Sequence, residues 1–240
     1  MFEQEITALQ RIIDESANIV FFGGAGVSTE SGIPDFRSED GLYHTKYSYP
    51  PERILSHSFF IQNPEVFYTF YREKILYLDA KPNPAHKKLA ELEKLGKLKA
   101  VVTQNIDGLH QKAGSKTVYE LHGSIHRNYC VECGKAYSAE FVKEVKGIPH
   151  CTCGGIIKPD VVLYEESLDG RTIQSAVSAI AKADTLIIGG TSLVVYPAAG
   201  FIDYFRGKHL LVINTSETGR AVRAELSINA PIGEILEKIG

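Results

Sequence analysis

The 240-residue chain is predicted to fold as an α/β protein, with a Rossmann-like parallel sheet covered by helices on both faces. Short apolar runs alternate with amphipathic segments, which is typical of parallel strands joined by crossover helices. Polar motifs follow several of these runs, where ligands of such sheets bind. Residues 39–80 and 126–157 break the alternation, so we interpret them as a helical insertion and a zinc-binding module within a main domain of 1–38, 81–125 and 158–240.

Helix and strand signals follow one another in the first half of the main domain. Apolar residues recur at helical spacing in 6–13, and the apolar run 18–22 then ends in glycines. Asn83-Pro84 predicts the start of another helix and Gly96 predicts its end, before a strand at 98–102. These signals predict two helix–strand pairs.

Three apolar runs in the second half, 160–163, 185–188 and 210–213, are predicted as further strands of the same sheet. The most apolar stretch, 186–201, is interrupted by glycines and by Pro197. It is therefore interpreted as strand, turn and helix rather than as a membrane span.

Composition excludes several classes of function. The 26 basic and 29 acidic residues give a net charge of -3, and there is no long basic run, so direct binding of nucleic acid is not expected. Charged residues interrupt the first 17 positions, which lack the apolar core of an export signal. We expect a cytoplasmic monomer without membrane contact.

The helical insertion is rich in aromatic residues, and two interpretations remain open. The rings could line a cleft, or they could form a helical mini-core, which is favoured because aromatics dominate small cores. The residues are Tyr43, Tyr47, Tyr49, Phe59, Phe60, Phe67, Tyr68, Phe70 and Tyr71.

All four cysteines lie in the second insertion, as Cys130, Cys133, Cys151 and Cys153. A segment of this size builds little core, so a structural zinc ion bound by four thiolates would supply folding energy. Two disulfides are the less favoured alternative, because no export signal is visible. The second pair is Cys-x-Cys, which leaves His126 and His150 as rival ligands.

The turn Gly24-Ala25-Gly26 follows a predicted strand, where glycine lets backbone amides approach a pyrophosphate. Thr29 stands where a full dinucleotide fingerprint has its third glycine. Such turns are often only structural, so this motif alone is not specific.

Two further motifs bring polar groups to the predicted ligand edge. Residues 103–107 follow a strand and carry amides and a carboxylate, although such residues more often form turns or helix caps. His122 follows the apolar stretch 118–121 and could be a general base, because histidine titrates near neutrality. The structural interpretation is preferred for His44, His57, His86, His110 and His209.

Taken together, these motifs resemble those of the sirtuins (Sir2 family) of bacterial or archaeal type, which are NAD-dependent protein lysine deacylases. The resemblance covers nearly the whole chain. It is carried by Gly24-Ala25-Gly26-Val27-Ser28, Gly32-Ile33-Pro34-Asp35-Phe36-Arg37, Thr103-Gln104-Asn105-Ile106-Asp107, Leu121-His122-Gly123, Gly190-Thr191-Ser192-Leu193, Val195-Tyr196-Pro197-Ala198 and the four cysteines.

The resemblance implies a reaction between NAD, as co-substrate, and an acetylated lysine of a protein or peptide. Nicotinamide leaves, the acyl oxygen attacks the ribose, and the products are nicotinamide, O-acetyl-ADP-ribose and deacetylated lysine. His122 would be the general base, while Asn105, with Gln104, would hold the ribose and an ordered water. Ile106 and Asp107 would bind the nicotinamide carboxamide.

The resemblance also implies the remaining contacts. Val161 and Val162 would pair with the backbone of the substrate peptide. Phe36 would screen the reacting ribose from water. NAD would be bound by Gly24, Ala25, Gly26 and Thr29 near the phosphates, by Asp35, Phe36 and Arg37 on or beside a covering loop, and by Gly190, Thr191, Ser192 and Asn214 towards the adenosine half.

One departure bears on the acyl group. Family members that prefer acidic acyl groups carry a tyrosine and, three residues on, an arginine in the acyl pocket. Here Tyr68 would line the pocket but is followed by Tyr71, and Arg72 lies about 100° further round a helix. An uncharged acyl group is therefore favoured over succinyl.

Two competing functions remain. One is a mono-ADP-ribosyltransferase on the same scaffold, and the other is a non-catalytic module that binds NAD or acyl-lysine. His122 and Asn105 argue against a pure binding module, which needs no general base. The cysteine module and the peptide-pairing segment favour the deacylase.

Overall fold

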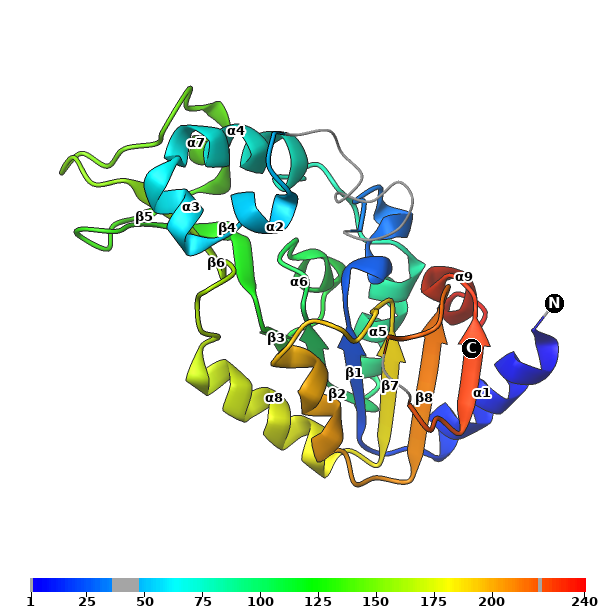
Figure 1. Cartoon of the computed structure of the whole chain (residues 1–240). Helices are drawn as coiled ribbons and strands as arrows, with labels where there is room; N and C mark the ends of the chain where they lie inside the picture. Colours follow the sequence, from blue (N-terminus) through cyan, green and yellow to red (C-terminus); the bar gives the residue numbers. More distant parts are fainter. Residues whose placement is uncertain (1, 36–47, 220–221) are drawn as a thin grey trace.

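The computed structural model describes residues 2–35, 48–219 and 222–240, and these form two parts joined side by side (Figure 1). The part that we call the large unit contains a six-stranded sheet. The part that we call the small unit contains a three-stranded sheet and most of the helices of the helical insertion. Both chain ends lie in the large unit.

The sheet of the large unit has the order β3-β2-β1-β7-β8-β9, and every neighbouring pair is parallel. The predicted parallel sheet is therefore confirmed, including strands at 18–22, 98–102, 185–188 and 210–213. The short last strand was not predicted. The bounds are β1 (Ile19–Gly23), β2 (Leu98–Thr103), β3 (Val118–Glu120), β7 (Thr185–Gly189), β8 (His209–Asn214) and β9 (Leu226–Asn229).

Helices cover both faces of this sheet, and alternate side chains of β1 point into the two resulting cores. Ile19 and Phe21 pack with α1, α5 and α9, whereas Val20 and Phe22 pack with α8 and the 3-10 helix η4. The bounds are α1 (Glu3–Glu15), α5 (Pro84–Lys94), α6 (Leu109–Ala113), α8 (Gly170–Lys182), η4 (Ala198–Tyr204) and α9 (Ile232–Leu236).

The predicted ends of α5 are confirmed. The Asn83 side chain accepts hydrogen bonds from the backbone N–H groups of Ala85 (2.9 Å) and His86 (3.4 Å), which satisfies the first turn. Gly96 has a φ of 73°, the left-handed conformation that ends a helix.

The small unit is built from both predicted insertions, which share one core. Its antiparallel sheet has the order β5-β4-β6. The described aromatics Phe59, Phe60, Phe67, Tyr68, Phe70 and Tyr71 are buried in this core, which confirms the mini-core, while Tyr43 and Tyr47 lie outside the described residues. The bounds are α2 (Pro51–Ile54), α3 (His57–Gln62), α4 (Pro64–Lys74), β4 (Gly123–Cys130), β5 (Ala136–Tyr137), α7 (Ala139–Glu144) and β6 (Ile157–Val161).

One predicted strand belongs to a different sheet. The run 160–163 was expected in the parallel sheet, but β6 ends at Val161 and pairs antiparallel with β4 in the small unit. The placement in the parallel sheet was therefore wrong. Its residues alternate between buried and half-buried, which is typical of a sheet with one exposed face rather than of a central parallel strand.

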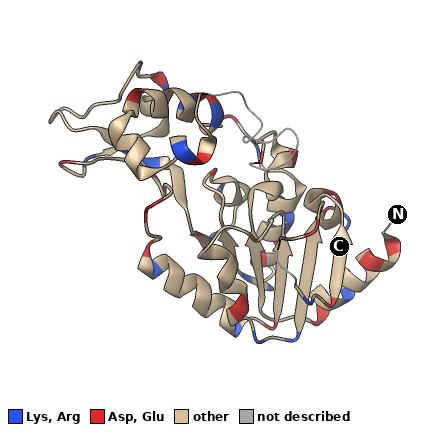
Figure 2. Cartoon of the chain, in the orientation of Figure 1, with Lys and Arg blue, Asp and Glu red and all other residues tan. Residues whose placement is uncertain are grey.

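The surface carries mixed charge. Figure 2 shows basic and acidic positions interspersed along the ribbon of both units, with few on the central strands. Within the described residues, no helix has the length and apolar character needed to cross a membrane.

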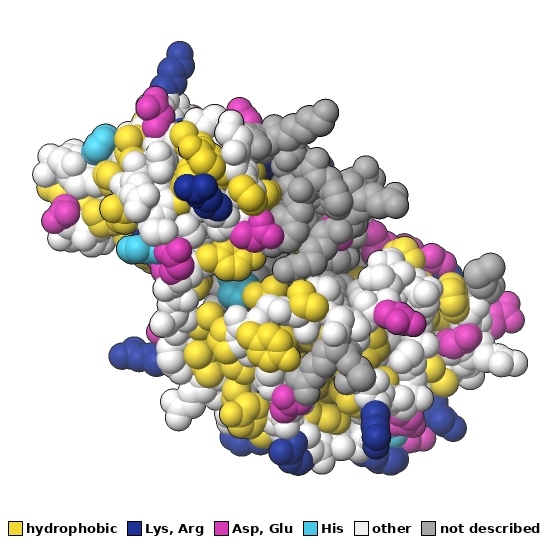
Figure 3. Space-filling model, viewed as in Figure 1, with side chains coloured by type: hydrophobic (Ala, Val, Ile, Leu, Met, Phe, Trp, Pro, Cys, Tyr) yellow, Lys and Arg dark blue, Asp and Glu magenta, His cyan; other side chains and the backbone are white. Residues whose placement is uncertain are grey.

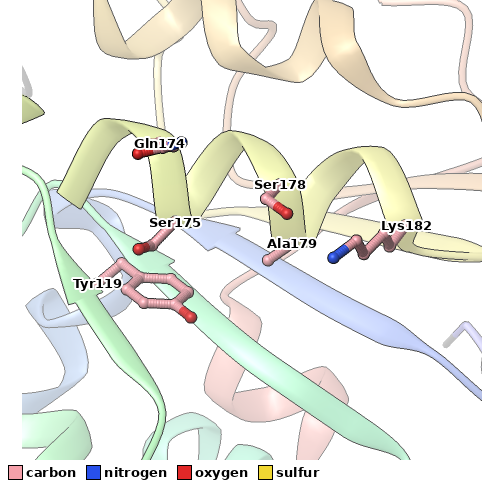
Figure 4. A pocket seen from close by; sticks show the side chains of 6 residues that line it. All are labelled: Tyr119, Gln174, Ser175, Ser178, Ala179 and Lys182. Carbon is pink, nitrogen blue, oxygen red and sulfur yellow. The ribbon is translucent and has the colours of Figure 1, made fainter. Parts of the chain in front are cut away.

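A hollow of about 380 Å³ opens between the edge strand β3 and α8. Figure 4 shows the ring of Tyr119 beneath Ser175, with Ser178 and Lys182 further along the same helix. None of the residues predicted to bind NAD or substrate lines it.

Candidate active site

Four strands of the large unit end at the same level. Thr103 is paired with both Glu120 and Gly23, and Gly23 is also paired with Gly189, so the loops that follow β3, β2, β1 and β7 begin side by side. The predicted convergence of polar motifs at the carboxyl edge is therefore confirmed. The space-filling view shows a hollow between the two units beside this edge, with a histidine side chain inside it (Figure 3).

The glycines at this edge allow two loops to touch. Gly26 N–H donates to the carbonyl of Gly190 (2.8 Å). A Cβ atom on Gly190 would lie 2.3 Å from the amide nitrogen of Val27, and one on Gly24 would lie 2.9 Å from Cβ of Thr191. Close backbone approach was predicted here for a pyrophosphate, which stays a prediction, and the structure shows close approach between the two loops.

A buried polar network links three of the motifs. The Asn105 side-chain amide donates to Ser28 Oγ (3.0 Å), which donates to the Asp107 carboxylate (2.7 Å). The Gln104 side-chain amide donates to Thr191 Oγ1 (3.0 Å). Ser28 was part of the glycine motif but was not predicted as a site residue. Only the folded structure shows that it is buried between the Asn105 amide and the Asp107 carboxylate.

The other carboxylate oxygen of Asp107 accepts the backbone N–H of Leu109 (2.9 Å). Asp107 therefore combines the turn-forming role that its sequence position suggested with a place in the buried network. Both Asn105 and Asp107 are buried, so their remaining polar groups need partners.

His122 lies beside this network in a defined tautomer. Its Nδ1–H donates to the carbonyl of Gln104 (3.0 Å), which leaves Nε2 with a free lone pair. Burial lowers the pKa of His122, and the bond to Gln104 partly opposes that shift. The imidazole is therefore neutral near pH 7 and able to accept a proton.

Other predicted cofactor residues are placed around the same edge. Thr29 Oγ1 donates to the carbonyl of Gly26 (3.0 Å), and Asn214 donates to the carbonyls of Thr191 (3.3 Å) and Ser216 (2.8 Å). Ala25 lies in the 3-10 turn Ala25–Val27, and Ser192 and Ile106 lie in the loops after β7 and β2. Asp35 is described, whereas Phe36 and Arg37 lie outside the described residues.

A histidine pair lies behind the network, fully buried between α5 and α6. The rings of His86 and His110 are 4.7 Å apart, and both nitrogens of His110 lack a hydrogen-bond partner. Burial lowers the pKa of His86 to about 4, against an opposing effect of Asp107, and lowers that of His110 to about 3. Both imidazoles are therefore neutral at pH 7.

The predicted peptide-pairing segment joins His122 to the small unit. Val161 is paired with Gly123, and the Val162 N–H donates to the carbonyl of His122 (3.0 Å). The N–H groups of Leu163 and Tyr164 are also bonded within the chain, to Glu166 and Leu55. Pairing with a peptide would therefore use the remaining backbone groups or exchange these bonds, and it stays a prediction.

Tyr68, the residue predicted to line the acyl pocket, lies in the core of the small unit. Its side chain is fully buried in the small unit, and its hydroxyl donates to the carbonyl of Ile157. Arg72 donates to the carbonyls of Val142 (2.8 Å) and Gly147 (2.7 Å). The prediction that Arg72 would not reach an acyl pocket agrees with these bonds, and a place for Tyr68 in that pocket stays a prediction.

The four cysteine sulfurs form one cluster in the small unit, all within 4.8 Å of one another. The pairs Cys130–Cys153, Cys133–Cys151 and Cys133–Cys153 are 3.4, 3.6 and 3.5 Å apart. These distances are too long for disulfides and fit four thiolates around a tetrahedral zinc ion, for which Zn–S is about 2.3 Å.

Histidine is not needed in this cluster. The His150 ring donates to the carbonyl of Gly154 (3.2 Å), and His126 donates to the carbonyl of Asp107 (2.9 Å), so both rival ligands are engaged elsewhere. The Cys153 backbone N–H and the Tyr137 hydroxyl lower the pKa of Cys151 to about 5. The neighbouring sulfurs raise the pKa of Cys153 instead, so the protons of the four thiols are shared unequally when no cation is present.

The parallel sheet, its touching loops and the polar edge together define a Rossmann-like dinucleotide-binding protein with an added cysteine module. Residues 24–197 match the model of the Sir2 family, and the chain belongs to that family. The resemblance in sequence is thereby confirmed.

Individual relatives are similar to this chain over nearly their whole length. An "NAD-dependent protein deacetylase" of Clostridium acetobutylicum is 63% identical over 239 residues, covering 98% of each chain. A solved structure of Sir2 with a deacetylated p53 peptide and 3'-O-acetyl-ADP-ribose is 40% identical, with a TM-score of 0.90 over 97% of this chain and 96% of that one. A solved Sir2–p53 peptide–NAD+ structure is 38% identical, with a TM-score of 0.86 over 99% and 96%.

Proposed function

We propose that the chain is an NAD-dependent protein lysine deacetylase that transfers the acetyl group to ADP-ribose. The observation that carries the proposal is the neutral His122, whose Nε2 is free beside the buried Asn105–Ser28–Asp107 network. Full-length similarity to deacetylases of the Sir2 family supports it.

The residues at the sheet edge fit NAD chemically. Asn105 and Asp107 offer buried amide and carboxylate groups to a carboxamide and to ribose hydroxyls, and Ser28 orients both of them. Bound NAD supplies a ribose carbon that becomes electrophilic when nicotinamide leaves. Thr191 and Asn214, which lie further along the edge, would hold the adenosine half.

His122 has the role of general base in this proposal. Gln104 holds the Nδ1–H, so the ring can take a proton only at Nε2. Low solvent access keeps the ring neutral at pH 7, which makes a ribose hydroxyl a suitable proton donor to it. As the resemblance to the Sir2 family implies, the base would act after nicotinamide has left.

The proposed substrate is an acetylated lysine of a protein or peptide. The known Sir2 structures with an acetylated or a deacetylated peptide support this class. An uncharged acyl group is favoured because Arg72 donates to two backbone carbonyls and Tyr68 is buried, so neither offers a free group to an acidic acyl chain. A succinylated peptide should react much more slowly than an acetylated one.

Zinc has a structural role in this proposal. Four cysteine ligands complete a tetrahedral shell and leave no position for a catalytic water. We further propose a monomer located in the cytoplasm, and sedimentation analysis and cell fractionation test these two points.

The deciding experiment is mass spectrometry of an acetyl-lysine peptide incubated with the protein and NAD. The expected products are deacetylated peptide, nicotinamide and O-acetyl-ADP-ribose, with a loss of about 10²-fold or more in His122→Ala. His209→Ala is the control, because His209 pairs with Glu225 at the opposite end of β8. Absence of O-acetyl-ADP-ribose would contradict the proposal, and a peptide carrying ADP-ribose would indicate the transferase instead.

A further inference from the structure

A bulge in β4 connects the small unit to the site. Along the β4–β6 pair, Ser124 faces Asp160 but Asn128 already faces Pro159, so residues 125–127 have no partner on β6. The fully buried Asn128 side chain donates to the carbonyl of Ile125 (3.3 Å) and closes the bulge.

Each residue of the bulge reaches toward the large unit. The Ile125 N–H donates to the carbonyl of Ile106 (2.9 Å). The Arg127 guanidinium binds Glu120 (2.8 Å), at the end of β3, and also Asp160 (2.7 Å). The bulge therefore contacts both segments that carry the site, the loop after β2 and the strand that precedes His122.

His126 makes the contact nearest to the buried network. Its Nε2–H donates to the main-chain carbonyl of Asp107 (2.9 Å), and its ring lies against Gly108. Gly108 has a φ of 71°, and a Cβ atom there would be 2.7 Å from the His126 ring. The turn after Asp107 is thus shaped to receive this imidazole.

We infer that His126 is a positioning residue for the NAD site, acting on Asp107 from the small unit. The inference rests on the proposed role of Asp107 in binding NAD. Ser28 holds the Asp107 carboxylate from the large unit, while His126 holds the carbonyl of the same residue from the small unit. The orientation of Asp107 therefore depends on both units being in their described arrangement.

The physical consequence is a change in NAD binding rather than in chemistry. Without the His126 donor, the peptide group after Asp107 can rotate, so the carboxylate spends less time in its network geometry. A lost hydrogen bond of about 1 kcal/mol corresponds to roughly a fivefold weaker affinity. His122 keeps its own bond to Gln104, so its tautomer does not change.

Three variants separate positioning from a general loss of fold. His126→Phe keeps a ring against Gly108 but removes the donor, and His126→Gln keeps a side-chain N–H at similar reach. His150→Phe is the control, because His150 donates only within the small unit, to Gly154. Zinc content is measured for each variant.

NAD binding is measured by calorimetry without peptide, and the KM values for NAD and for an acetyl-lysine peptide are measured alongside kcat. For His126→Phe we expect the Kd and KM for NAD to rise about fivefold, with peptide KM and kcat within about twofold, and near-complete rescue in His126→Gln. The inference is overturned if NAD affinity is unchanged, or if His126→Gln and His150→Phe weaken NAD equally. Wild-type binding of NAD without deacetylation would instead contradict the proposed function.

Discussion

Glycines in the two units serve different purposes. Gly24, Gly26 and Gly190 of the large unit have backbone atoms or a packed side chain where a Cβ would stand. Gly147 and Gly154 of the small unit adopt left-handed φ values, of 71° and 92°, and open space surrounds their Cβ positions. Glycine therefore permits close packing at Gly24, Gly26 and Gly190, whereas at Gly147 and Gly154 it only permits a turn.

The two units also differ in the interactions that stabilise them. The large unit buries apolar side chains on both faces of a six-stranded sheet. The small unit has one aromatic core and a four-cysteine cluster. Metal binding supplies folding free energy to the segment that carries the ligands, so removal of zinc should affect the small unit directly.

Removal of zinc has the largest expected effect. Structural zinc contributes on the order of 10 kcal/mol in small zinc-dependent folds. Chelation should unfold the small unit and abolish deacetylation, while amides of β1 and β7 stay protected in hydrogen exchange. Readdition of zinc should restore activity, and simultaneous loss of protection in β1 and β4 would show that the units are not independent.

The glycine contrast is tested by Gly190→Ala and Gly147→Ala. A left-handed alanine costs about 1–2 kcal/mol, and overpacking adds about 1–3 kcal/mol where there is no space. Chemical denaturation should therefore show a larger loss of unfolding free energy for Gly190→Ala, together with weaker NAD binding. Equal losses in the two variants would mean that loop contact at Gly190 contributes little.

The buried His86–His110 pair predicts a pH dependence in the large unit. The folded-state pKa values, about 4 and about 3, lie below the usual 6.5, so the unfolded chain binds protons that the folded chain does not. The contribution of the two neutral histidines to the free energy of unfolding is present above about pH 6.5 and is lost as the pH falls toward 4. Each group loses about 1 kcal/mol over the first pH unit below 6.5.

Urea unfolding of the wild type and of His110→Phe at about pH 7.5 and 5.5 measures this effect. The variant should show a shallower fall in unfolding free energy. Metal loss at acid pH affects both proteins and cancels in the difference. An identical pH dependence in both proteins would mean that His110 does not contribute to the loss of stability at acid pH.

Loss of a helix cap in the small unit has the smallest expected effect. The Ser138 hydroxyl accepts the backbone N–H of Phe141 (3.2 Å) and caps α7. Ser138→Ala should lower stability by about 1 kcal/mol, and Ser138→Asp should retain the cap. Faster hydrogen exchange is expected in α7 and not in α5, and equal effects in both helices would contradict local action.

Local sequence patterns predicted the large unit well. Strands β1, β2, β7 and β8 are nearly continuous apolar runs, and such runs are specified by their own residues. Strand β9 (Leu226–Asn229) was missed because it is short and half exposed. Strand β6 was recognised as extended but placed in the wrong sheet, since pairing depends on distant residues.

The site also contains residues that local motifs predicted and residues whose positions depend on packing. Asn105, Asp107 and His122 were predicted from motifs whose order along the chain is specific. His126 lies in the β4 bulge, where its ring donates to the carbonyl of Asp107, and local sequence does not predict this contact. The burial of Tyr68 in the core of the small unit depends on the packing of helix α4, which local patterns do not show.

The sequence by itself determined the parallel sheet, the cysteine ligands and the residue types at the sheet edge, because periodicity and motif spacing are local properties. Only the tertiary structure decided that Gly26 and Gly190 touch, that His122 presents Nε2, and that His126 contacts Asp107. These features depend on how two units pack, and packing joins residues that no local pattern relates. The chain therefore encodes the parts of the site locally and their alignment globally.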